Sequence, residues 1–245
     1  YGAGGSTRSK TIDLVGRIKK EIGLESMAHL TCVGHSANEI NSVLKSIENE
    51  NIDNVLALRG DPPQGETIFI KPESGFGYAS ELVVFTNKNF SFCIGVAGYP
   101  ETHPESSDRK QDLMHLKEKI NAGASYIITQ LFFDNKFYFD FVDDLRAIGV
   151  NVPIIPGIMP ILNLKQTKRF TKMCGATIPI ALMASLESVQ SDPEAISEIG
   201  IDHATKQCRD LLKKGAPGIH FYTLNQSRAT LSVLERLKND STITK

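Results

Sequence analysis

The sequence contains no tryptophan, no closely spaced cysteines and no long apolar run. Its four cysteines, Cys32, Cys93, Cys174 and Cys208, form no CxxC pair, so reduced thiols are expected rather than a zinc site or a disulfide framework. No apolar run approaches the roughly 20 residues that a membrane helix needs. Basic residues do not cluster, and the formal net charge is -1. These absences predict a cytoplasmic protein with a small-molecule partner, and neither a membrane nor a nucleic-acid partner.

Several catalytic motifs are missing as well. The sequence has no Gly-x-Ser-x-Gly elbow, no Walker glycine loop and no Gly-x-Gly-x-x-Gly fingerprint, so covalent and ATP chemistry are unsupported. His29 and His35 do not have the spacing of two metal ligands on a helix, so no metal is predicted. Chemistry must therefore rest on a bound cofactor or on a carboxylate outside this chain.

The chain does contain a regular alternation of apolar runs and helical patterns. Strands are expected near residues 29, 54, 92, 126, 153 and 218, and each is followed by a helical pattern. The apolar runs are nearly continuous, as in Tyr126-Ile127-Ile128-Thr129, which is typical of a parallel sheet buried on both faces. Because no flexible linker interrupts the alternation, we predict one α/β domain over residues 1–245.

The alternation favours a (β/α)8 TIM barrel over a doubly wound sheet, which usually carries a Gly-rich first turn. The stretch from Tyr1 to Gly5 reads as the end of a strand, so the barrel is expected to lack its first strand and most of its second. Helical patterns near 163–173, 179–188 and 193–214 exceed what one crossover needs, which predicts an extra helix before the last strand.

Local signals place several helix boundaries and faces. Gly23 is expected to end the first helix, and Ser36 and Glu39 form the Ser-x-x-Glu pattern of a capping box. The apolar positions expected to form helix faces are Ile12, Val15, Ile18 and Ile22 in the first helix and Leu231, Leu234 and Leu237 in the last.

The most informative stretch is Arg59-Gly60-Asp61, which follows an apolar strand directly and precedes Pro62. Parallel α/β folds hold their ligands at the carboxyl ends of the strands. Glycine allows close approach of a ligand to the backbone, and proline stiffens the exit. Arg59 and Asp61 could instead form a salt bridge that closes a loop, but their position at a strand end favours a site.

Three other polar residues near strand ends have two interpretations each. His29 fits either a core histidine or a ligand contact, and His103 fits either a solvated loop or a functional group. Gln130 is expected inside a strand over residues 126–133, where a buried amide needs hydrogen-bond partners. A ligand amide or ring edge would provide such partners.

Asp112, His115 and Lys119 recur at helical spacing after the loop that contains His103. Such a row is typical of a solvated helix face. Phosphate binding by Lys119 is the alternative.

Six motifs, in order along essentially the whole chain, resemble the 5,10-methylenetetrahydrofolate reductase family. They are His29-Leu30-Thr31-Cys32, Leu58-Arg59-Gly60-Asp61-Pro62-Pro63, Tyr99-Pro100-Glu101-Thr102-His103-Pro104-Glu105, Ile128-Thr129-Gln130-Leu131-Phe132-Phe133, Pro156-Gly157-Ile158-Met159-Pro160 and His220-Phe221-Tyr222-Thr223-Leu224-Asn225. The chain is similar to the catalytic domain of a bacterial-type member, truncated at its N-terminus.

The resemblance implies a homo-oligomeric cytoplasmic flavoprotein of one-carbon metabolism and methionine biosynthesis. NADH or NADPH would give a hydride to non-covalently bound FAD, which would reduce 5,10-methylenetetrahydrofolate to 5-methyltetrahydrofolate. The sequence does not select between NADH and NADPH. The positions that match flavin contacts of the family are Tyr1, Ala3, His29, Arg59, Gly60, Asp61, Tyr78, Ala79, Tyr99, His103, Asp112, His115 and Lys119.

Four positions match folate contacts by the same resemblance: Asp61, Gln130, Tyr222 and Gln226. Asp61 would be the catalytic residue of this chain, lying beside the flavin ring and the folate and tuning the electronics of both. Gln130 would bind the nicotinamide amide and the pterin in turn. Many family members carry Arg where this chain has Gln226, and Glu118 stands where a basic residue can help bind the FAD phosphates.

The family's catalytic Glu lies in a first-strand motif that this sequence does not contain. The 245-residue chain is therefore expected to be inactive until one or two βα units are restored. Two other functions stay open at this point. One is a pterin-binding barrel methyltransferase without flavin, and the other is a non-catalytic protein that binds folate or flavin.

Overall fold

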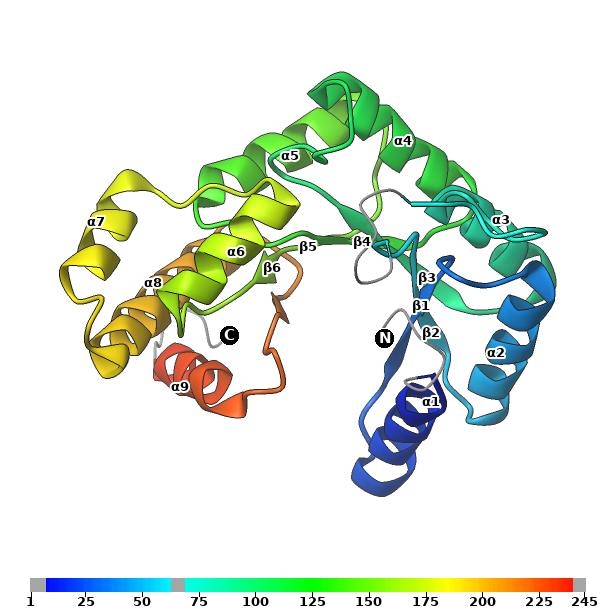
Figure 1. The fold of residues 1–245 in the computed structure, drawn as a ribbon, viewed down its shortest axis with the longest axis horizontal. Helices are drawn as coiled ribbons and strands as arrows, with labels where there is room; N and C mark the ends of the chain where they lie inside the picture. The colour runs from blue at the N-terminus through cyan, green and yellow to red at the C-terminus, as the bar shows by residue number, and fades with distance from the viewer. Residues whose placement is uncertain (1–7, 63–68, 240–245) are drawn as a thin grey trace. The chain divides into compact units, whose positions relative to one another are not determined.

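The structure is a computed structural model that describes residues 8–62 and 69–239. Strands and helices alternate along the described chain (Figure 1). The chain divides into two compact units, of which unit 1 comprises Tyr1–Ala97 and His115–Ile127, and unit 2 comprises Gly98–Met114 and Ile128–Lys245. The assignment of residues 1–245 to a single domain stays a prediction.

The strands of the described residues are parallel where their pairing is recorded. They are β1 (Met27–Thr31), β2 (Asn54–Leu58), β3 (Cys93–Gly98), β4 (Tyr126–Thr129), β5 (Ile154–Ile155), β6 (Gly157–Ile158) and β7 (His220–Phe221). In β1, His29 lies opposite Leu56 of β2, which lies opposite Gly95 of β3. Strands β1 to β5 are neighbours in chain order, and β6 pairs with β7. This order of parallel strands joined by helices is that of a (β/α) barrel, which confirms the predicted α/β fold class.

The helices lie between these strands, as the periodicity predicts. They are α1 (Arg8–Arg17), the π-helix η2 (Ile18–Ile22), α2 (Ala37–Asn49), α3 (Ala79–Asn89), α4 (Arg109–Asn121), α5 (Asn135–Ala147), α6 (Leu164–Cys174), α7 (Ile180–Ser188), α8 (Pro193–Lys213) and α9 (Ser227–Lys238). The capping box is confirmed, because Ser36 Oγ accepts from Glu39 N and a Glu39 carboxylate oxygen accepts from Ser36 N at 2.8 Å. Gly23 ends the first helix with φ 74°.

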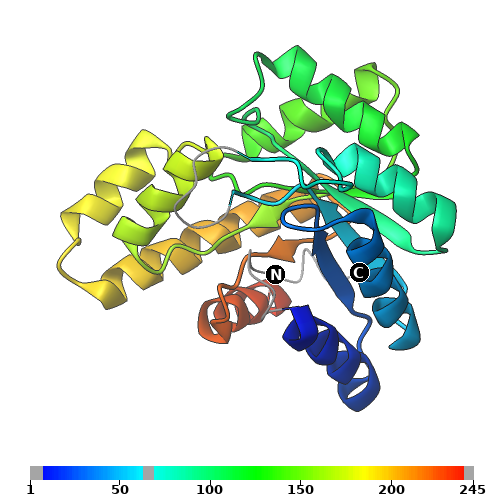
Figure 2. The ribbon, with the colours of Figure 1, turned by 45° about the vertical axis from the view of Figure 1, so that its right-hand side comes forward.

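Unit 1 is built around β1, β2 and β3. Helix α2 presents Ile40, Val43, Leu44 and Ile47 to the core, and all four side chains are buried. Their spacing gives one apolar stripe on the helix. Helix α1 packs beside β1 and α2, as the dark blue helix next to the first strand in Figure 2 shows.

Unit 2 contains the predicted insertion, which comprises α6, α7 and the 21-residue α8 between β6 and β7 (Figure 1). An apolar cluster of this unit joins residues that follow β4 and β6 to these helices. The cluster consists of Leu131, Phe133, Met159, Ile161, Leu164, Leu182, Leu186 and Ile196. Helix α8 also fixes the loop after β4, because His203 Nε2 bonds with Phe133 O at 2.9 Å and Gln207 Nε2 donates to Phe132 O at 3.2 Å.

Two predicted strands end differently in the structure. The strand expected over 126–133 ends at Thr129, so Gln130 lies in the exit of β4 and not inside a strand. Leu131 to Phe133 are buried although they form no strand. Because these residues are apolar like those of β4, the predicted strand was too long. The strand expected near residue 153 is divided into β5 and β6 at Pro156, which lacks a backbone N–H.

Two predicted helix faces are partly wrong. Leu231 and Leu234 of α9 are 53% and 38% exposed, whereas Ala229, Val233 and Leu237 are buried. The apolar face of α9 thus follows an i, i+4, i+8 row. Ile22 is 64% exposed because the last turn of the first helix is a π-helix, which rotates the side chain relative to an α-helical position.

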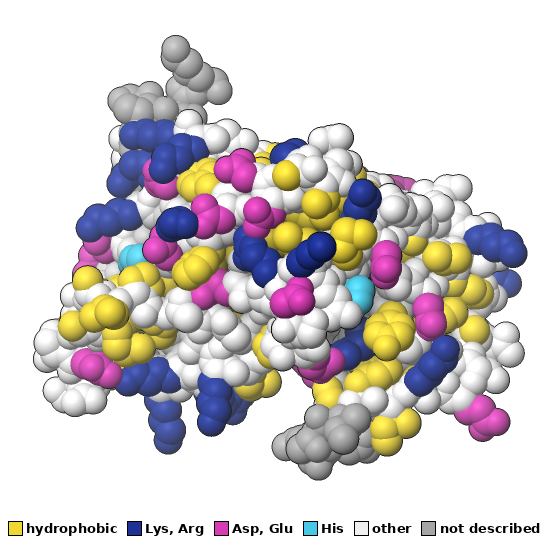
Figure 3. Space-filling view, turned by 90° about the horizontal axis from the view of Figure 1, so that it is seen from above, with side chains coloured by type: hydrophobic (Ala, Val, Ile, Leu, Met, Phe, Trp, Pro, Cys, Tyr) yellow, Lys and Arg dark blue, Asp and Glu magenta, His cyan; other side chains and the backbone are white. Residues whose placement is uncertain are grey.

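All four cysteines are free. Cys32 and Cys208 are buried, and this burial raises the pKa of each thiol to about 12. Cys174 is half-buried and Cys93 is exposed. No described helix is both long and apolar enough to cross a membrane. On the face drawn in Figure 3, acidic and basic side chains are interspersed.

Candidate functional site

In unit 1, the exits of β1 and β2 are tied together by backbone hydrogen bonds. Val33 N donates to Arg59 O at 3.1 Å, and Cys32 N donates to Leu58 O and Arg59 O. Gly60 follows with φ 88°, and a Cβ there would lie 2.8 Å from Val33 Cγ1. Both the positive φ and the lack of space require glycine at this position. The backbone therefore fixes where Arg59 and Asp61 leave the sheet.

The side chains of this exit differ in exposure. The Arg59 guanidinium lies 5.0 Å from the centroid of the Phe69 ring, a cation–π contact that holds it near the end of β2. Asp61 is exposed. A cation and a carboxylate thus lie two residues apart just after the end of β2, as the sequence predicts for this strand end.

Other predicted residues of unit 1 lie on β1, α3 and α4. His29 is half-buried in β1, and Tyr78 precedes α3 with 65% of its surface exposed. Ala79 begins α3 and is half-buried, and His115 is exposed on α4. Lys119 does not lie on a solvated face, because its Nζ donates to Ala97 O of β3 at 2.6 Å.

In unit 2, the loop between β3 and α4 holds Tyr99 and His103. Their rings meet edge to face with centroids 4.4 Å apart. Asp112 of α4 accepts a hydrogen bond from His103 N at 3.0 Å, and His103 Nδ1 accepts one from Glu105 N at 3.1 Å. Both Asp112 and His103 are therefore structural parts of this loop, and neither is a freely solvated side chain.

The same loop contains a residue with unusual backbone geometry. Thr102 has φ 77°, a conformation that β-branched residues rarely adopt and that costs about 1–3 kcal/mol. The neighbouring Glu101 carboxylate accepts bonds from Thr177 N at 3.0 and 3.1 Å and from Thr177 Oγ1 at 2.5 Å. Burial raises the pKa of Glu101, and the Thr177 donors oppose that rise.

The exit of β4 is also held by hydrogen bonds. Gln130 N donates to Gly98 O at 2.7 Å, and Gln130 Oε1 accepts from Leu131 N at 2.9 Å. Thr129 O accepts from the Tyr222 hydroxyl at 2.8 Å. Burial raises the pKa of Tyr222, so its hydroxyl keeps this proton and donates it to the backbone. Tyr222 can therefore contact a ligand through its aromatic ring, but its hydroxyl is not available as a proton donor to that ligand.

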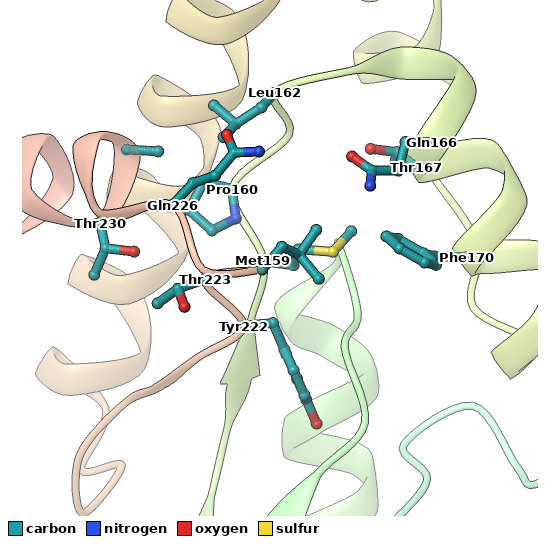
Figure 4. A pocket seen from close by; sticks show the side chains of 12 residues that line it. Met159, Pro160, Leu162, Gln166, Thr167, Phe170, Tyr222, Thr223, Gln226 and Thr230 are labelled. Carbon is teal, nitrogen blue, oxygen red and sulfur yellow. The ribbon is translucent and has the colours of Figure 1, made fainter. Parts of the chain in front are cut away.

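A shallow pocket lies next to Tyr222 in unit 2 (Figure 4). It is lined by Met159, Pro160, Leu162, Gln166, Thr167, Phe170, Tyr222, Thr223, Leu224, Gln226, Ala229 and Thr230. It encloses only about 10 Å³, so a ligand would have to lie over its open side. The buried Thr230 Oγ1 has no hydrogen-bond partner within the described residues. An apolar floor with two amides and an unpaired hydroxyl suits a flat ligand with polar edges.

The pocket brings together two predicted residues, Tyr222 and Gln226, with others that sequence reasoning missed, among them Met159, Gln166 and Phe170. Met159 follows β6, and Gln166 and Phe170 come from the inserted helix α6. In the sequence, Gln166 and Phe170 belong to an ordinary amphipathic helix pattern. Their position in the pocket can therefore be identified only from the fold. Tyr1 and Ala3 lie outside the described residues.

The family model described as "Methylenetetrahydrofolate reductase" matches residues 1–238 of the chain. "Methylenetetrahydrofolate reductase (NADH) 1" of Arabidopsis thaliana is 41% identical over 97% of this chain and 42% of that protein. "5,10-methylenetetrahydrofolate reductase" of Escherichia coli (strain K12) is 37% identical over 97% of this chain and 78% of that protein. The chain thus spans less than half the length of the plant relative.

A solved structure supports the fold at low sequence identity. It is described as an uncharacterized protein from Clostridium thermocellum that binds two copies of 5-methyl-5,6,7,8-tetrahydrofolic acid. It aligns with a TM-score of 0.57 and 18% identity over 90% of this chain and 76% of that chain. At this identity the likeness shows the fold alone.

Proposed function

This chain belongs to the methylenetetrahydrofolate reductase family, and we propose that the full-length protein reduces 5,10-methylenetetrahydrofolate to 5-methyltetrahydrofolate with NADH or NADPH. The observation that carries the proposal is the Arg59-Gly60-Asp61 exit of β2, whose backbone is fixed against the exit of β1. Cytoplasmic location is part of the proposal.

The residues of this strand-end region fit a flavin dinucleotide. Arg59 and Lys119 are cations at the carboxyl ends of β2 and β3, and they suit the diphosphate. Tyr78 provides an exposed aromatic ring beside the start of α3. Bound FAD would supply the two-electron chemistry that no side chain of this chain provides.

The reaction assigns a clear task to Asp61. The bond between the bridging methylene carbon and N10 breaks, the carbon gains a hydride, and N10 gains a proton. Positive charge develops on the pterin side as that bond breaks, and a carboxylate placed beside it stabilises the charge. Asp61 is exposed at the strand exit and would perform this role.

The shallow pocket of unit 2 would take part of the folate. Phe170 and Met159 provide an apolar surface for a flat ring, and Gln166 and Gln226 provide amides for its polar edges (Figure 4). The unpaired Thr230 hydroxyl would gain a partner. Gln130, at the exit of β4, would bind the nicotinamide amide and the pterin in turn.

A visible spectrum of the purified full-length protein tests the proposal. We expect a yellow protein that bleaches when NADH or NADPH is added without oxygen, and whose colour returns on addition of 5,10-methylenetetrahydrofolate. Adding NADH and NADPH in separate experiments identifies the preferred donor.

The same experiment separates the other two functions. A methyltransferase without flavin would be colourless. A non-catalytic flavin-binding protein would be yellow but would not bleach with either nicotinamide. Either result would contradict the proposed reductase.

A further inference from the structure

The loop between β3 and α4 is held by three anchors within unit 2. Arg109 Nη1 donates to Pro100 O at 2.7 Å, and Arg109 Nε pairs with Asp144 Oδ2 at 2.7 Å. Asp112 accepts from His103 N. These two anchors come from α4, the helix that follows the loop. The third is the carboxylate of Glu101, which reaches a different part of unit 2.

Glu101 binds the connection between α6 and α7. Its carboxylate accepts from both the backbone N and the hydroxyl of Thr177. The end of α6 also packs on the loop, because a Cβ at Gly175 would lie 3.2 Å from Pro104 Cγ. Helix α6 carries Gln166 and Phe170, which line the shallow pocket. Glu101 therefore links the Tyr99–His103 loop to the helix that lines this pocket.

The bonding of Glu101 is unusual for a residue that only stabilises the fold. In the described part of the chain its carboxylate partners all belong to Thr177, so no cation neutralises it. A half-buried carboxylate held only by neutral donors is less favourable than a neutral amide of the same shape. The next residue, Thr102, is kept at a positive φ. Strained backbone next to a charged side chain that joins two segments is typical of a functional position.

We propose that Glu101 is a positioning residue that clamps the β3–α4 loop to the α6–α7 connection. The clamp fixes Tyr99 and His103 for the flavin and couples their placement to the folate-side helix α6. This inference rests on the proposed function, since it assigns the two sides of the clamp to flavin and folate.

The test uses the full-length protein, four single variants and the double variant that combines Glu101→Ala with Thr177→Val. Glu101→Ala removes the clamp, and Thr177→Val removes only the hydroxyl donor. Thr177→Ser keeps the hydroxyl donor and removes only the methyl group. Glu187→Gln is the matched control, because the Lys168–Glu187 pair joins α6 to α7 without touching the loop. The measurements are the dissociation constant of FAD, from the fluorescence of free flavin, and the KM for folate and for the nicotinamide donor.

We expect Glu101→Ala to weaken FAD binding about tenfold, which is the effect of one hydrogen bond to a charged group. Thr177→Val should weaken it about threefold, and adding this change to Glu101→Ala should weaken binding no further. Thr177→Ser and Glu187→Gln should bind FAD as the unmodified protein does. Because α6 is coupled to the loop, the KM for folate should rise more than the KM for the nicotinamide donor.

Two results would overturn the inference alone. One is unchanged FAD affinity in Glu101→Ala while the unmodified protein is a working flavoprotein. The other is additive effects of Glu101→Ala and Thr177→Val, which would show that the two residues do not act through one clamp. An unmodified protein that binds no flavin would overturn the proposed function, and this inference with it.

Discussion

Replacing Gly157 with Ala should disturb the packing between β6, β4 and Tyr222. A Cβ at Gly157 would overlap Thr129 O and would lie 2.6 Å from Tyr222 Cε2. The first of these is backbone held in a sheet, so it cannot move aside without shifting β4. The second is the ring that donates its hydroxyl proton to the same Thr129 O. The methyl group therefore forces either the strand or the ring to move.

The size of the effect follows from these contacts. Overpacking a well-packed site costs about 1–3 kcal/mol. Loss of the Tyr222–Thr129 hydrogen bond adds about 0.5–1.5 kcal/mol. For a domain of this size each kcal/mol lowers Tm by about 2–4 °C, so a loss of about 3 kcal/mol lowers Tm by about 6–12 °C.

Thermal unfolding of the full-length protein, followed by near-ultraviolet circular dichroism, measures this effect. Gly218→Ala is the matched control, because no atom lies within 4 Å of the added Cβ. Tyr222→Phe measures the hydrogen-bond share alone and should cost about 1 kcal/mol. The steric argument is wrong if Gly157→Ala and Gly218→Ala change Tm equally.

Three further predictions concern the proposed chemistry and the pH dependence. Asp61→Asn should slow folate reduction at least tenfold while FAD affinity changes little; equal loss of both, measured by turnover and flavin fluorescence, would make Asp61 a structural residue. Phe170→Ala should raise the KM for folate more than the KM for NADH or NADPH, whereas Met173→Ala, on the exposed side of α6, should change neither in steady-state kinetics. Burial lowers the pKa of His203 below its usual 6.5. As the pH drops below about 6.5, this histidine is therefore protonated in the unfolded chain more readily than in the folded protein. The free energy of unfolding consequently decreases as the pH drops below about 6.5. Urea unfolding at several pH values should show a smaller fall for His203→Asn; identical pH dependence of the two proteins would contradict this.

The order of the elements could be predicted because its signals are local. Ser36 and Glu39 cap a helix through bonds between residues three apart, and Gly23 ends one by its own φ. The end of β4 could not be predicted, because Leu131 to Phe133 are as buried as the strand before them. Pro156 did carry a signal for the break between β5 and β6, since proline cannot complete a ladder of hydrogen bonds.

The candidate site was predictable only where it lies at strand ends. Arg59 and Asp61 stand out because charge directly follows an apolar run. The partner of Glu101 is 76 residues away in the chain, so no spacing pattern could identify Thr177. Phe170 is half-buried on an amphipathic helix, so its sequence pattern is that of a core residue. Its role in the pocket depends on residues near β7 and on α9, which are distant in the sequence.

The uneven burial of the cysteines gives the protein a natural attachment point for a probe. Thiolates, and not thiols, react with maleimides, so Cys32 and Cys208, with pKa values of about 12, are protected in the folded state. Cys93 is exposed and begins β3, at the opposite end of that strand from Ala97 and Lys119. A dye on Cys93 would therefore report flavin binding by energy transfer from a position where it blocks none of the proposed contacts.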